Sequence, residues 1–565
     1  MFSRNPGHRN RFSRFFTKAI WKMATQKDWN STESFYNYTR GRFVVNEAEE
    51  MRQRHVRFDV NELARLAANT VGAKEVVNIE KCADGLFNKA FVFTFEDGKQ
   101  VVGKVPNPIA IIPHLTTASE VATMEFMRTV LKTPTPRVYA WSSRVDDSKN
   151  SVGAEFIIME KISGIPLGKV WERLSGSDKM KVLINIFKYQ NEWASVAFSR
   201  FGSLYYSGDV DILPADYLYI DKNGNQVNNP RFVVGPASHN EWFIHGRDSV
   251  SCDRGPWNTV IDYRKAIAHR EITASRLLPF PRQTLLIYGP RPLYLPTVEK
   301  KVAALKCSLQ SLETFLPEDP ALLRGHLWHT DFHHENIYVN PGKPTEITEI
   351  IDWQSTPITP LFDQPLDLPF VNYDGPDIGE NLEIPVLPDD FQSMQEDEKK
   401  KVHKNYMDKS AVVAWRLLLK HKNPAYYRAV LFKHTPIGLT LELSRQVFTI
   451  GESSLRTIYA EMGEDWQEYA PKGSDMNPVP CPFNFSQAEI TEIDEDEEAT
   501  ASSTRIAAQI QEHLGPLYPH KGVIEHENYE EVKKILGEIK QEVIEHLFES
   551  TEDIQTFDSQ WPYRD

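Results

Sequence analysis

Apolar positions after residue 57 predict a short helix followed by strands. Leu63, Leu66 and Ala67 fall on one face of a helix, and Asp59 or Asn61 could cap its start. Three segments rich in β-branched and aromatic residues follow at residues 76–82, 91–95 and 99–105. The change of periodicity predicts a unit that combines a helix with a small sheet.

The dipeptide Asp97-Gly98 predicts a tight hairpin between the second and third of these strands. If the hairpin loop has two residues, Lys104 lies opposite Phe91. Lys104 would then stand beside the loop of residues 83–90, which enters the second strand.

The rest of the chain has mainly helical patterns. A helix at about residues 118–131 carries Glu120 near its start, and strands are expected at 138–141 and 155–159. Residues 160–164 are interpreted as a crossing between two lobes. Further helices are expected at residues 179–198, 302–315, 399–419, 440–462, 501–516 and 528–548.

Two segments lack these patterns. Residues 204–300 are rich in turn signals such as Asn223-Gly224, which predicts an elaborated surface insertion. The acidic run at residues 493–498 is typical of a solvated linker. No internal repeat is visible.

One short stretch concentrates polar residues around a predicted hairpin. Residues 337–351 combine β-prone positions with central turn chemistry, so Asn336 and Asp352 would flank the open end of the hairpin. Asp331 lies five residues before Asn336. Oxygen donors gathered in this way are typical of a Mg²⁺ site, and Asp331 could orient a hydroxyl.

Composition narrows the class of protein. The 565 residues can form several cores, and a hydrophobic content of 41% is that of a soluble globular protein without an apolar run that could span a membrane. A net charge of −14 argues against a general nucleic-acid binder. The four cysteines lack metal-site or disulfide spacing, which indicates free thiols in a reducing compartment.

The first 27 residues depart from the acidic average. They carry arginines and lysines without any aspartate or glutamate, and Phe12, Phe15, Phe16, Ile20 and Met23 share one side of a helical projection. This pattern predicts a mitochondrial transit peptide. A disordered basic arm is the alternative, and Met23 could start a shorter cytosolic product.

Phosphoryl transfer from ATP requires groups that grip phosphates, hold Mg²⁺ and aim an acceptor hydroxyl. The loop containing Gly85 and Asn88 could approach phosphates through its backbone N–H groups, because glycine removes the Cβ and permits positive φ. Lys104 could bind the α- and β-phosphates, and Glu120 could hold that lysine in place. Each of these residues taken alone is more often structural, whereas Asp331, Asn336 and Asp352 together form a specific signal.

Motifs along residues 58–470 resemble the aminoglycoside phosphotransferase and choline kinase branch of the protein-kinase-like fold. The matching motifs are Gly85-x-x-Asn88-x-x-Phe91, Val102-Gly103-Lys104, Glu120, Met159-Glu160-x-x-x-Gly164-x-x-Leu167, His329-x-Asp331-x-x-x-x-Asn336, Ile351-Asp352-Trp353 and Asp363-x-x-x-Asp367-Leu368. The basic start, the Arg254-Gly255-Pro256-Trp257 segment and the tail also resemble the fungal mitochondrial family called altered inheritance of mitochondria protein 9. The resemblance implies an α+β fold of two lobes: a small antiparallel-sheet N-lobe and a larger, mainly helical C-lobe with insertions.

The resemblance also implies a role for each motif residue, with ATP and Mg²⁺ as cofactors. Asp331 would be the catalytic base, and Asn336 and Asp352 would be the metal ligands. Nucleotide binding would fall to Gly85, Asn88, the ion pair of Lys104 with Glu120, and the backbone between Glu160 and Ile162, which would meet the adenine.

The expected organisation follows the chain. The segments are a transit peptide at 1–27, an N-terminal arm at 28–57, a nucleotide-binding N-lobe at 58–160, a catalytic C-lobe at 161–480 with the insertion at 204–300, and an acidic linker with closing helices at 481–565. The sequence does not fix the oligomeric state.

Two departures from protein kinases bear on function. His333 stands where protein kinases usually place a lysine, and Asp352-Trp353-Gln354 replaces Asp-Phe-Gly. We therefore expect a mitochondrial phosphotransferase that acts on a hydroxyl of an unidentified small molecule. A pseudokinase or binding scaffold is the alternative from another class, and an unusual protein kinase is a third.

The acceptor itself is not identified by the sequence. Its specificity could reside in the insertion, which contains Tyr205, Tyr206, Trp242, Arg247 and Trp257. Aromatic residues in such a segment more often serve packing.

Overall fold

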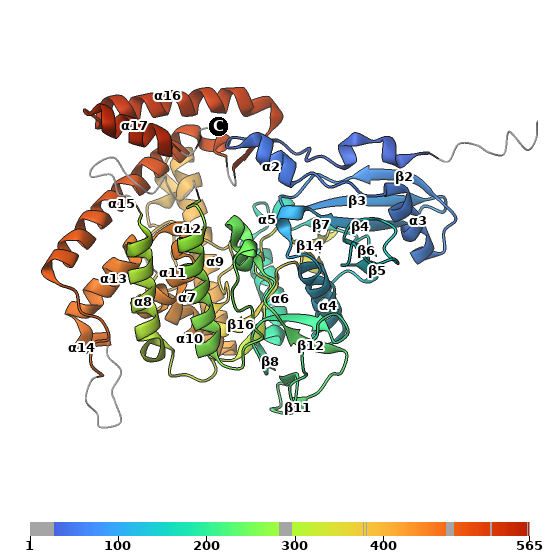
Figure 1. Cartoon of the computed structure of the whole chain (residues 1–565), viewed down its shortest axis with the longest axis horizontal. Coiled ribbons are helices and arrows are strands. Elements are labelled where there is room, and N and C mark those ends of the chain that lie inside the picture. Colours follow the sequence, from blue (N-terminus) through green and yellow to red (C-terminus); the bar gives the residue numbers. More distant parts are fainter. Residues whose placement is uncertain are drawn as a thin grey trace, which may run out of the picture.

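The computed structural model describes residues 27–281, 296–376, 378–379, 381–469, 479–519, 522–561 and 563. Within these residues the chain forms a small lobe built on a sheet and a larger lobe built mainly of helices (Figure 1). The predicted transit peptide lies outside the described residues except for Lys27. The predicted α+β architecture with a small antiparallel-sheet lobe is confirmed.

The small lobe is organised by a five-stranded antiparallel sheet in the order β2-β3-β4-β6-β5. Its strands are β2 (Val76–Lys81), β3 (Asn88–Phe95), β4 (Gln100–Pro106), β5 (Val138–Ser142) and β6 (Phe156–Glu160). Helix α3 (Val60–Val71) begins at Asp59, whose side chain accepts the backbone N–H of Glu62. The amphipathic face of α3 buries Leu63 and Ala67 against the sheet.

The hairpin between β3 and β4 corrects the predicted register by one residue. Lys104 pairs with Ala90, whereas a two-residue loop would have placed it opposite Phe91. The backbone N–H of Gly98 donates to the Phe95 carbonyl at 2.9 Å, and Gly98 has a φ of 81°. A left-handed glycine at this position gives a three-residue loop, which shifts the pairing.

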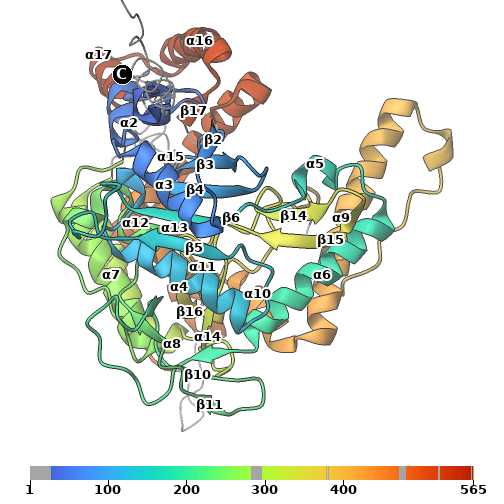
Figure 2. The same ribbon diagram turned by 90° about the vertical axis from the view of Figure 1, so that its right-hand side faces the viewer.

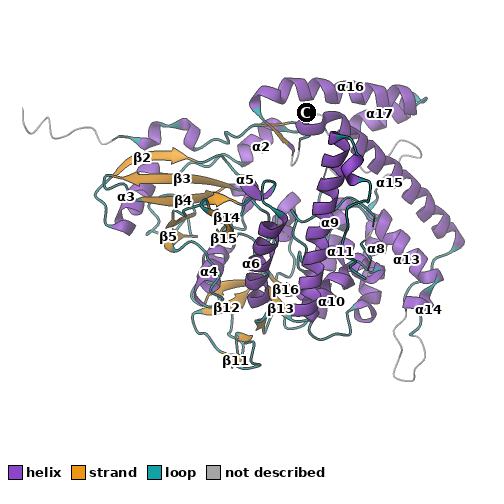
Figure 3. Ribbon diagram, turned by 180° about the vertical axis from the view of Figure 1, so that it is seen from behind, coloured by secondary structure: helices purple, strands orange, loops and turns teal. Residues whose placement is uncertain are grey.

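Helix α4 (Leu115–Thr129) follows β4 and carries Glu120. After β6 the chain crosses at residues 161–164 to the larger lobe, where Figures 1 and 3 show the helices gathered. Its helices are α5 (Gly168–Trp171), α6 (Gly176–Ala194), α7 (Val260–Leu277), α8 (Val298–Phe315), α9 (Glu396–Lys422), α10 (Pro424–Lys433), α11 (Pro436–Ser444), α12 (Val447–Ile450), α13 (Ser453–Glu464) and α14 (Trp466–Tyr469).

The single helix predicted at 440–462 is wrong, because three helices, α11, α12 and α13, cover this stretch. Gly451 follows α12 with a φ of 95°, a conformation that an α-helix cannot continue through. The apolar spacing persists across the breaks, which is why periodicity alone merged the three helices.

Short strands complete the larger lobe. One sheet has the order β15-β14-β7 and another has the order β11-β10-β8-β13-β16, with β9 and β12 paired separately. Their bounds are β7 (Ile165–Pro166), β8 (Ala197–Phe198), β9 (Ser203–Tyr206), β10 (Tyr219–Ile220), β11 (Gln226–Val227), β12 (Phe232–Gly235), β13 (Gly325–Leu327), β14 (Ile337–Asn340), β15 (Lys343–Ile350) and β16 (Ile358–Pro360). Short 3-10 helices lie at Trp29–Ser31, Glu33–Phe35, Pro108–Ala110, Asn240–Trp242, Ile244–Ser249, Leu361–Asp363, Phe391–Ser393, Gly515–Leu517 and His526–Asn528.

Within the segment at 204–300, residues 282–295 lie outside the described residues, and the rest is less of a surface insertion than predicted. It contains α7, an 18-residue helix that packs in the main core, and Trp242 and Trp257 are buried with their rings stacked 5.3 Å apart. Tyr205 and Arg247 are also buried. Turn residues dominate the local pattern, whereas the burial of aromatic rings stabilises the described part of the segment.

The C-terminal part folds back over the N-terminal arm. It consists of α15 (Gln487–Leu514), β17 (Val523–Ile524), α16 (Tyr529–Leu547) and α17 (Thr551–Gln560), and the arm contains β1 (Arg42–Phe43) and α2 (Glu47–Gln53). Strand β17 pairs with β1, and Figures 1 and 2 both show α16 close to α2.

The linker predicted at 493–498 is wrong, because these residues lie inside α15. Asp496 contacts Lys300 at 2.7 Å and Arg456 at 3.1 Å. Lys300 and Arg456, which are distant in sequence, therefore compensate negative charge in the acidic run. The run considered alone resembles a solvated linker. Among the described helices, none is long and apolar enough to cross a membrane.

Candidate functional site

An ion-pair cluster joins the two lobes. The Lys104 ammonium on β4 lies 2.7 Å from the Glu120 carboxylate on α4 and 2.9 Å from the Asp352 carboxylate. The side chains of Lys104 and Glu120 are 8% and 5% exposed, whereas that of Asp352 is 38% exposed. One lysine therefore contacts a buried and a half-buried carboxylate.

The electrostatics of the cluster favour a charged lysine. Burial by itself would lower the pKa of Lys104, but the negative charges of Asp352 and Glu120 hold that pKa above its ordinary value. Burial raises the pKa of Glu120, and the adjacent Lys104 opposes that shift. The cation in this cluster is the kind of point charge that binds phosphate oxygens.

The hairpin of β14 and β15 positions the polar residues predicted to hold a metal. Ile337 pairs with Ile350, and the backbone N–H of Ile351 donates to the Asn336 carbonyl at 3.0 Å. Asn336 and Asp352 consequently flank the open end of the hairpin, as the sequence pattern predicts. Asp352 has a φ of 61°, a left-handed conformation that is costly for a residue with a Cβ and common at functional sites.

Asn336 is tied to the loop that precedes it. Its Nδ2 donates to the backbone carbonyl of Asp331 at 2.9 Å. Because the amide nitrogen donates this hydrogen bond, the amide oxygen of Asn336 is the atom that could bind a metal.

His329 clamps the Asp331 loop to the strand that leads to Asp352. Its Nε2 donates to the Ile351 carbonyl at 2.8 Å, and its Nδ1 accepts the backbone N–H of Asp331 at 3.2 Å. The two bonds require the neutral tautomer protonated at Nε2, in agreement with the burial that lowers the pKa of His329. His329 therefore fixes the relative positions of two candidate functional segments.

The Asp331 side chain is accessible. It is 58% exposed, and its carboxylate lies 3.3 Å from Nε2 of His333. The position predicted to hold lysine in a protein kinase thus holds an imidazole that contacts Asp331. An accessible carboxylate is required of a residue that accepts a proton from a bound substrate.

The backbone conformation of Gly85, in the loop before β3, differs from the one predicted. Gly85 does not adopt a positive φ, and a Cβ built there would meet nothing closer than the Asn88 carbonyl at 3.9 Å. Gly85 therefore does not use the positive φ that glycine permits, and its part in phosphate binding stays a prediction.

Asn88 is the polar side chain of this loop that reaches the site. Its Nδ2 donates to Oε1 of Gln354 at 2.6 Å, and Nε2 of Gln354 donates to the Ala110 carbonyl at 2.9 Å. Oδ1 of Asn88 is buried without a partner in the structure. A buried acceptor of this kind costs free energy unless a ligand or water satisfies it.

The N-terminal arm braces the same loop. Nε of Arg54 donates to the Leu86 carbonyl at 3.1 Å, and Nζ of Lys89 donates to the Arg54 carbonyl at 2.6 Å. Asp84 accepts the backbone N–H of Thr39 at 2.8 Å. The sequence carried no signal for this brace, since the arm lies more than 25 residues before the loop.

Glu160 is the last residue of β6, and Ile162 follows it where the chain crosses between the lobes. The Glu160 backbone N–H donates to the Arg137 carbonyl at 2.8 Å. Burial, and then the negative charge of Glu160, raise the pKa of Glu349 to about 7. Glu160 is thus one of two carboxyl groups at the crossing.

The structure brings most of the predicted residues together. Lys104, Glu120 and Asp352 are in direct contact, and Asp331 and Asn336 share a hydrogen bond. Asn88 connects to this group through Gln354, the third residue of the Asp352-Trp353-Gln354 triplet, for which the sequence predicted no contact.

The oxygen donors of Asn336 and Asp352 fit Mg²⁺. Among the described residues, no group of three or more histidine, cysteine, aspartate and glutamate side chains is placed to hold a metal ion. Asn336 and Asp352 instead offer an amide oxygen and a carboxylate. Mg²⁺ is typically held by one or two such oxygens, with waters and substrate phosphates as the remaining ligands.

Comparison with curated proteins finds fungal relatives over most of the chain. A subtelomeric hrmA-associated cluster protein of Aspergillus fumigatus is 28% identical over 530 residues, which is 86% of this chain and 97% of that protein. Altered inheritance of mitochondria protein 9, mitochondrial, of Yarrowia lipolytica is 24% identical over 443 residues, 72% of each chain. Several other fungal relatives have the same mitochondrial name. No family model matches the chain.

Comparison with solved structures finds phosphotransferases. A complex of aminoglycoside phosphotransferase APH(4)-Ia with ADP and hygromycin B matches with a TM-score of 0.33 and 13% identity, covering 78% of this chain and 98% of that one. A fructosamine-3-kinase homologue from Thermobifida fusca matches with a TM-score of 0.34 and 13% identity, covering 70% and 96%.

Proposed function

We propose that this protein is an ATP- and Mg²⁺-dependent phosphotransferase that acts on a hydroxyl group of a small molecule. The observation that carries the proposal is the contact of Lys104 with both Glu120 and Asp352, beside a loop that holds Asp331 and Asn336. Phosphoryl transfer depends mainly on positioning and on electrostatic stabilisation, and these residues supply both.

Each residue has a distinct part in the proposed reaction. Lys104 binds the α- and β-phosphates, and the loop containing Asn88 covers them. Asp331 orients the acceptor hydroxyl and takes its proton as the hydroxyl oxygen bonds to the γ-phosphorus. The bond between that phosphorus and the β–γ bridging oxygen breaks, and ADP leaves.

Asn336 and Asp352 are the residues that would hold Mg²⁺. When bound, Mg²⁺ neutralises negative charge on the phosphate oxygens. His329 keeps these ligands in register with Asp331, because its two hydrogen bonds connect the two segments.

Two features favour a small acceptor over a protein. His333 contacts Asp331 at the position where protein kinases use lysine. The segment after Asp352 is also immobilised, since Trp353 is fully buried and its Nε1 donates to the Ile350 carbonyl at 3.0 Å. A segment held in this way does not provide the switch that activation segments of protein kinases require.

The proposed compartment is the mitochondrion. The basic, acid-free start of the chain and the mitochondrial names of several relatives support this proposal. Imaging of the full chain with a C-terminal fluorescent tag would test it, with removal of residues 1–27 as the control.

The phosphotransferase proposal is tested by binding and turnover together. Purified protein should bind ATP by calorimetry when Mg²⁺ is present and lose most of that affinity with a chelator. Incubation with MgATP and a metabolite extract should yield a metabolite that gains one phosphate by mass spectrometry. Metal-dependent binding without any such product would favour a pseudokinase scaffold, and the absence of ATP binding would contradict the phosphotransferase function.

A further inference from the structure

A cavity of about 230 Å³ lies against the Asp331 loop. Residues from four parts of the chain line it, including His239, Glu241, Thr330, Ser355, Gln364 and Arg445. The volume is below the roughly 300 Å³ at which pockets for drug-sized ligands begin. The volume therefore limits any ligand of this cavity to a small molecule.

The position of the cavity connects it to the proposed chemistry. Thr330 immediately precedes Asp331, and its Oγ1 donates to the Ser355 carbonyl at 3.4 Å. Oγ of Ser355 donates to Oδ1 of Asn240 at 2.5 Å. The wall of the cavity is thus tied to the segment after Asp352 on one side and to residues 239–241 on the other.

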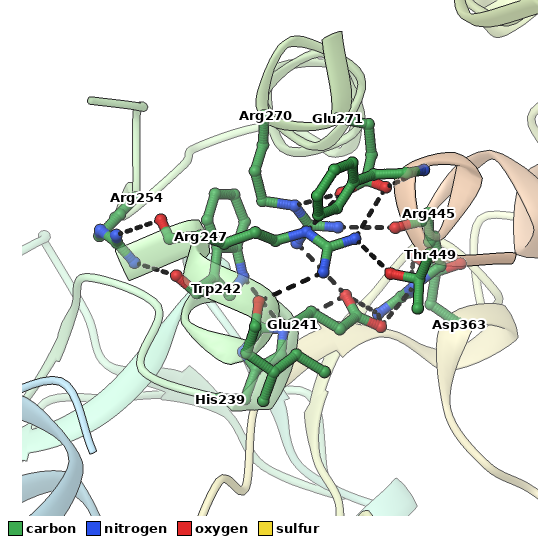
Figure 4. Close-up of polar contacts among 12 residues, drawn as sticks. His239, Glu241, Trp242, Arg247, Arg254, Arg270, Glu271, Asp363, Arg445 and Thr449 are labelled. Carbon is green, nitrogen blue, oxygen red and sulfur yellow. Dashed lines mark hydrogen bonds and ion pairs between the residues drawn. The ribbon is translucent and has the colours of Figure 1, made fainter. Parts of the chain in front are cut away.

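Each of the charged side chains that line the cavity has an ion-pair partner within the lining. Arg445 lies 2.9 Å from Glu241 and 3.0 Å from Asp363, and Figure 4 shows its guanidinium beside both carboxylates. Lys433 lies 3.8 Å from Glu442. A charged ligand would have to disrupt these pairs, whereas a neutral ligand would leave them intact.

Three buried polar atoms of the lining residues make no hydrogen bond, and one of them, Nη1 of Arg445, is ion-paired with Asp363. Nε1 of Trp242 donates to Nε2 of His239 at 3.1 Å, so a neutral His239 carries its proton on Nδ1. Nδ1 of His239 and Oε1 of Gln364 are both buried without a hydrogen bond, and the two residues are 4% and 0% exposed. The lining therefore offers one unpaired donor and one unpaired acceptor, which ligand groups would satisfy.

We infer that this cavity binds the acceptor and that the acceptor is a neutral polyhydroxylated molecule, such as a small sugar or polyol. A hydroxyl both donates and accepts, so hydroxyl groups can satisfy His239 and Gln364 without adding charge. Another hydroxyl of the same molecule bonds to the γ-phosphorus of ATP, loses its proton to Asp331 and releases ADP. This inference rests on the proposed phosphotransferase function.

The experiment measures ligand preference directly. Wild-type protein is screened with MgATP against uncharged probes (D-ribose, D-glucose, glycerol and myo-inositol) and charged probes (choline, D-glucosamine and L-serine), with product formation followed by mass spectrometry. Phosphorylation of at least one uncharged probe at tenfold higher kcat/KM than any charged probe is expected. Preference for a charged probe, or no phosphorylation of an uncharged one, would overturn the inference.

Variants then locate the site. His239→Phe and Gln364→Met should each raise KM for the preferred probe at least tenfold while leaving the KM for ATP within twofold. His239→Gln keeps an N–H donor and should recover most of the loss. His269→Ala, in a separate cavity of about 510 Å³, is the matched control and should behave as wild type.

The readouts separate the two proposals. If all four variants have the same KM for the acceptor as the wild-type protein, the cavity assignment is overturned even though the enzyme is active. Failure of wild-type protein to bind MgATP would instead contradict the phosphotransferase function. Melting temperatures within a few degrees of wild type show that a variant is folded. If His239→Phe is not folded, Gln364→Met decides the assignment.

Discussion

The ammonium of Lys104 lies 2.9 Å from the carboxylate of Asp352, and this contact joins the sheet of the small lobe to the hairpin of the large lobe. Lys104 also contacts Glu120 at 2.7 Å within the small lobe. One cation thus connects the candidate phosphate-binding strand to a candidate metal ligand. Its removal should affect nucleotide binding and stability in different ways.

Lys104→Met should abolish measurable MgATP binding and destabilise the protein by about 3–5 kcal/mol, because Glu120 would remain buried without its partner. Calorimetry and urea unfolding would measure the two effects. The double variant Lys104→Met/Glu120→Gln should regain most of the stability and none of the ATP affinity. Recovery of ATP affinity in the double variant would contradict the role given to Lys104.

Arg54→Ala should weaken MgATP binding about fivefold, which corresponds to about 1 kcal/mol for one hydrogen bond that holds the phosphate loop. The reason is that Arg54 donates to the Leu86 carbonyl from the N-terminal arm. The matched control is Arg52→Ala, because Arg52 is 74% exposed and contacts Glu49. Identical ATP affinities in the two variants would show that the arm does not position the loop.

Glu271→Gln should lower the free energy of unfolding by about 3–5 kcal/mol, since it leaves a buried guanidinium without its counter-charge. Arg247 contacts Glu271 through two hydrogen bonds of 2.9 Å, and both side chains are at most 2% exposed (Figure 4). The control variant Glu461→Gln, at an exposed position, should change the free energy of unfolding by less than about 0.5 kcal/mol. A loss in Glu271→Gln no larger than in the control would contradict this account of the buried network.

His326 should make stability depend on pH. Burial lowers the pKa of His326 to about 4, whereas an unfolded histidine titrates near pH ~6.5. The unfolded state binds more protons between these values, so the contribution is complete above about pH 6.5 and is lost as pH falls towards the folded pKa. Between these pH values the free energy of unfolding should fall by about 1.4 kcal/mol for each unit by which the pH decreases.

Urea unfolding of wild type and His326→Asn between pH 7.5 and pH 4 would measure this dependence. Asparagine keeps an N–H that can donate to the Val196 carbonyl, as Nδ1 of His326 does at 2.8 Å. The stability of wild type should fall relative to the variant as pH decreases. A constant difference would show that His326 is not the titrating group.

Local patterns predicted those parts of the fold that depend on local chemistry. The strands of the small lobe, the Asp59 cap and the hairpin that carries Asn336 and Asp352 all follow from residue type and spacing. The register of Lys104 was wrong by one residue, because the conformation of Gly98 sets the loop length.

Long-range contacts account for most of the remaining differences. Lys300 and Arg456 compensate Asp496 inside α15, and aromatic rings such as those of Trp242 and Trp257 pack together in the described part of residues 204–300. The hydrogen bond of Gln354 to Asn88 joins residues 266 positions apart. No spacing rule within one sequence can predict such pairs.

Transfer of the γ-phosphate of labelled ATP to a metabolite, compared between wild type and Asp331→Asn, tests the central claim most directly. Asparagine preserves the shape of Asp331 but cannot accept the hydroxyl proton. The variant should keep MgATP affinity within about threefold and lose at least two orders of magnitude in kcat, a typical contribution of general-base catalysis. Equal transfer by both proteins would contradict the assignment of Asp331 as the base.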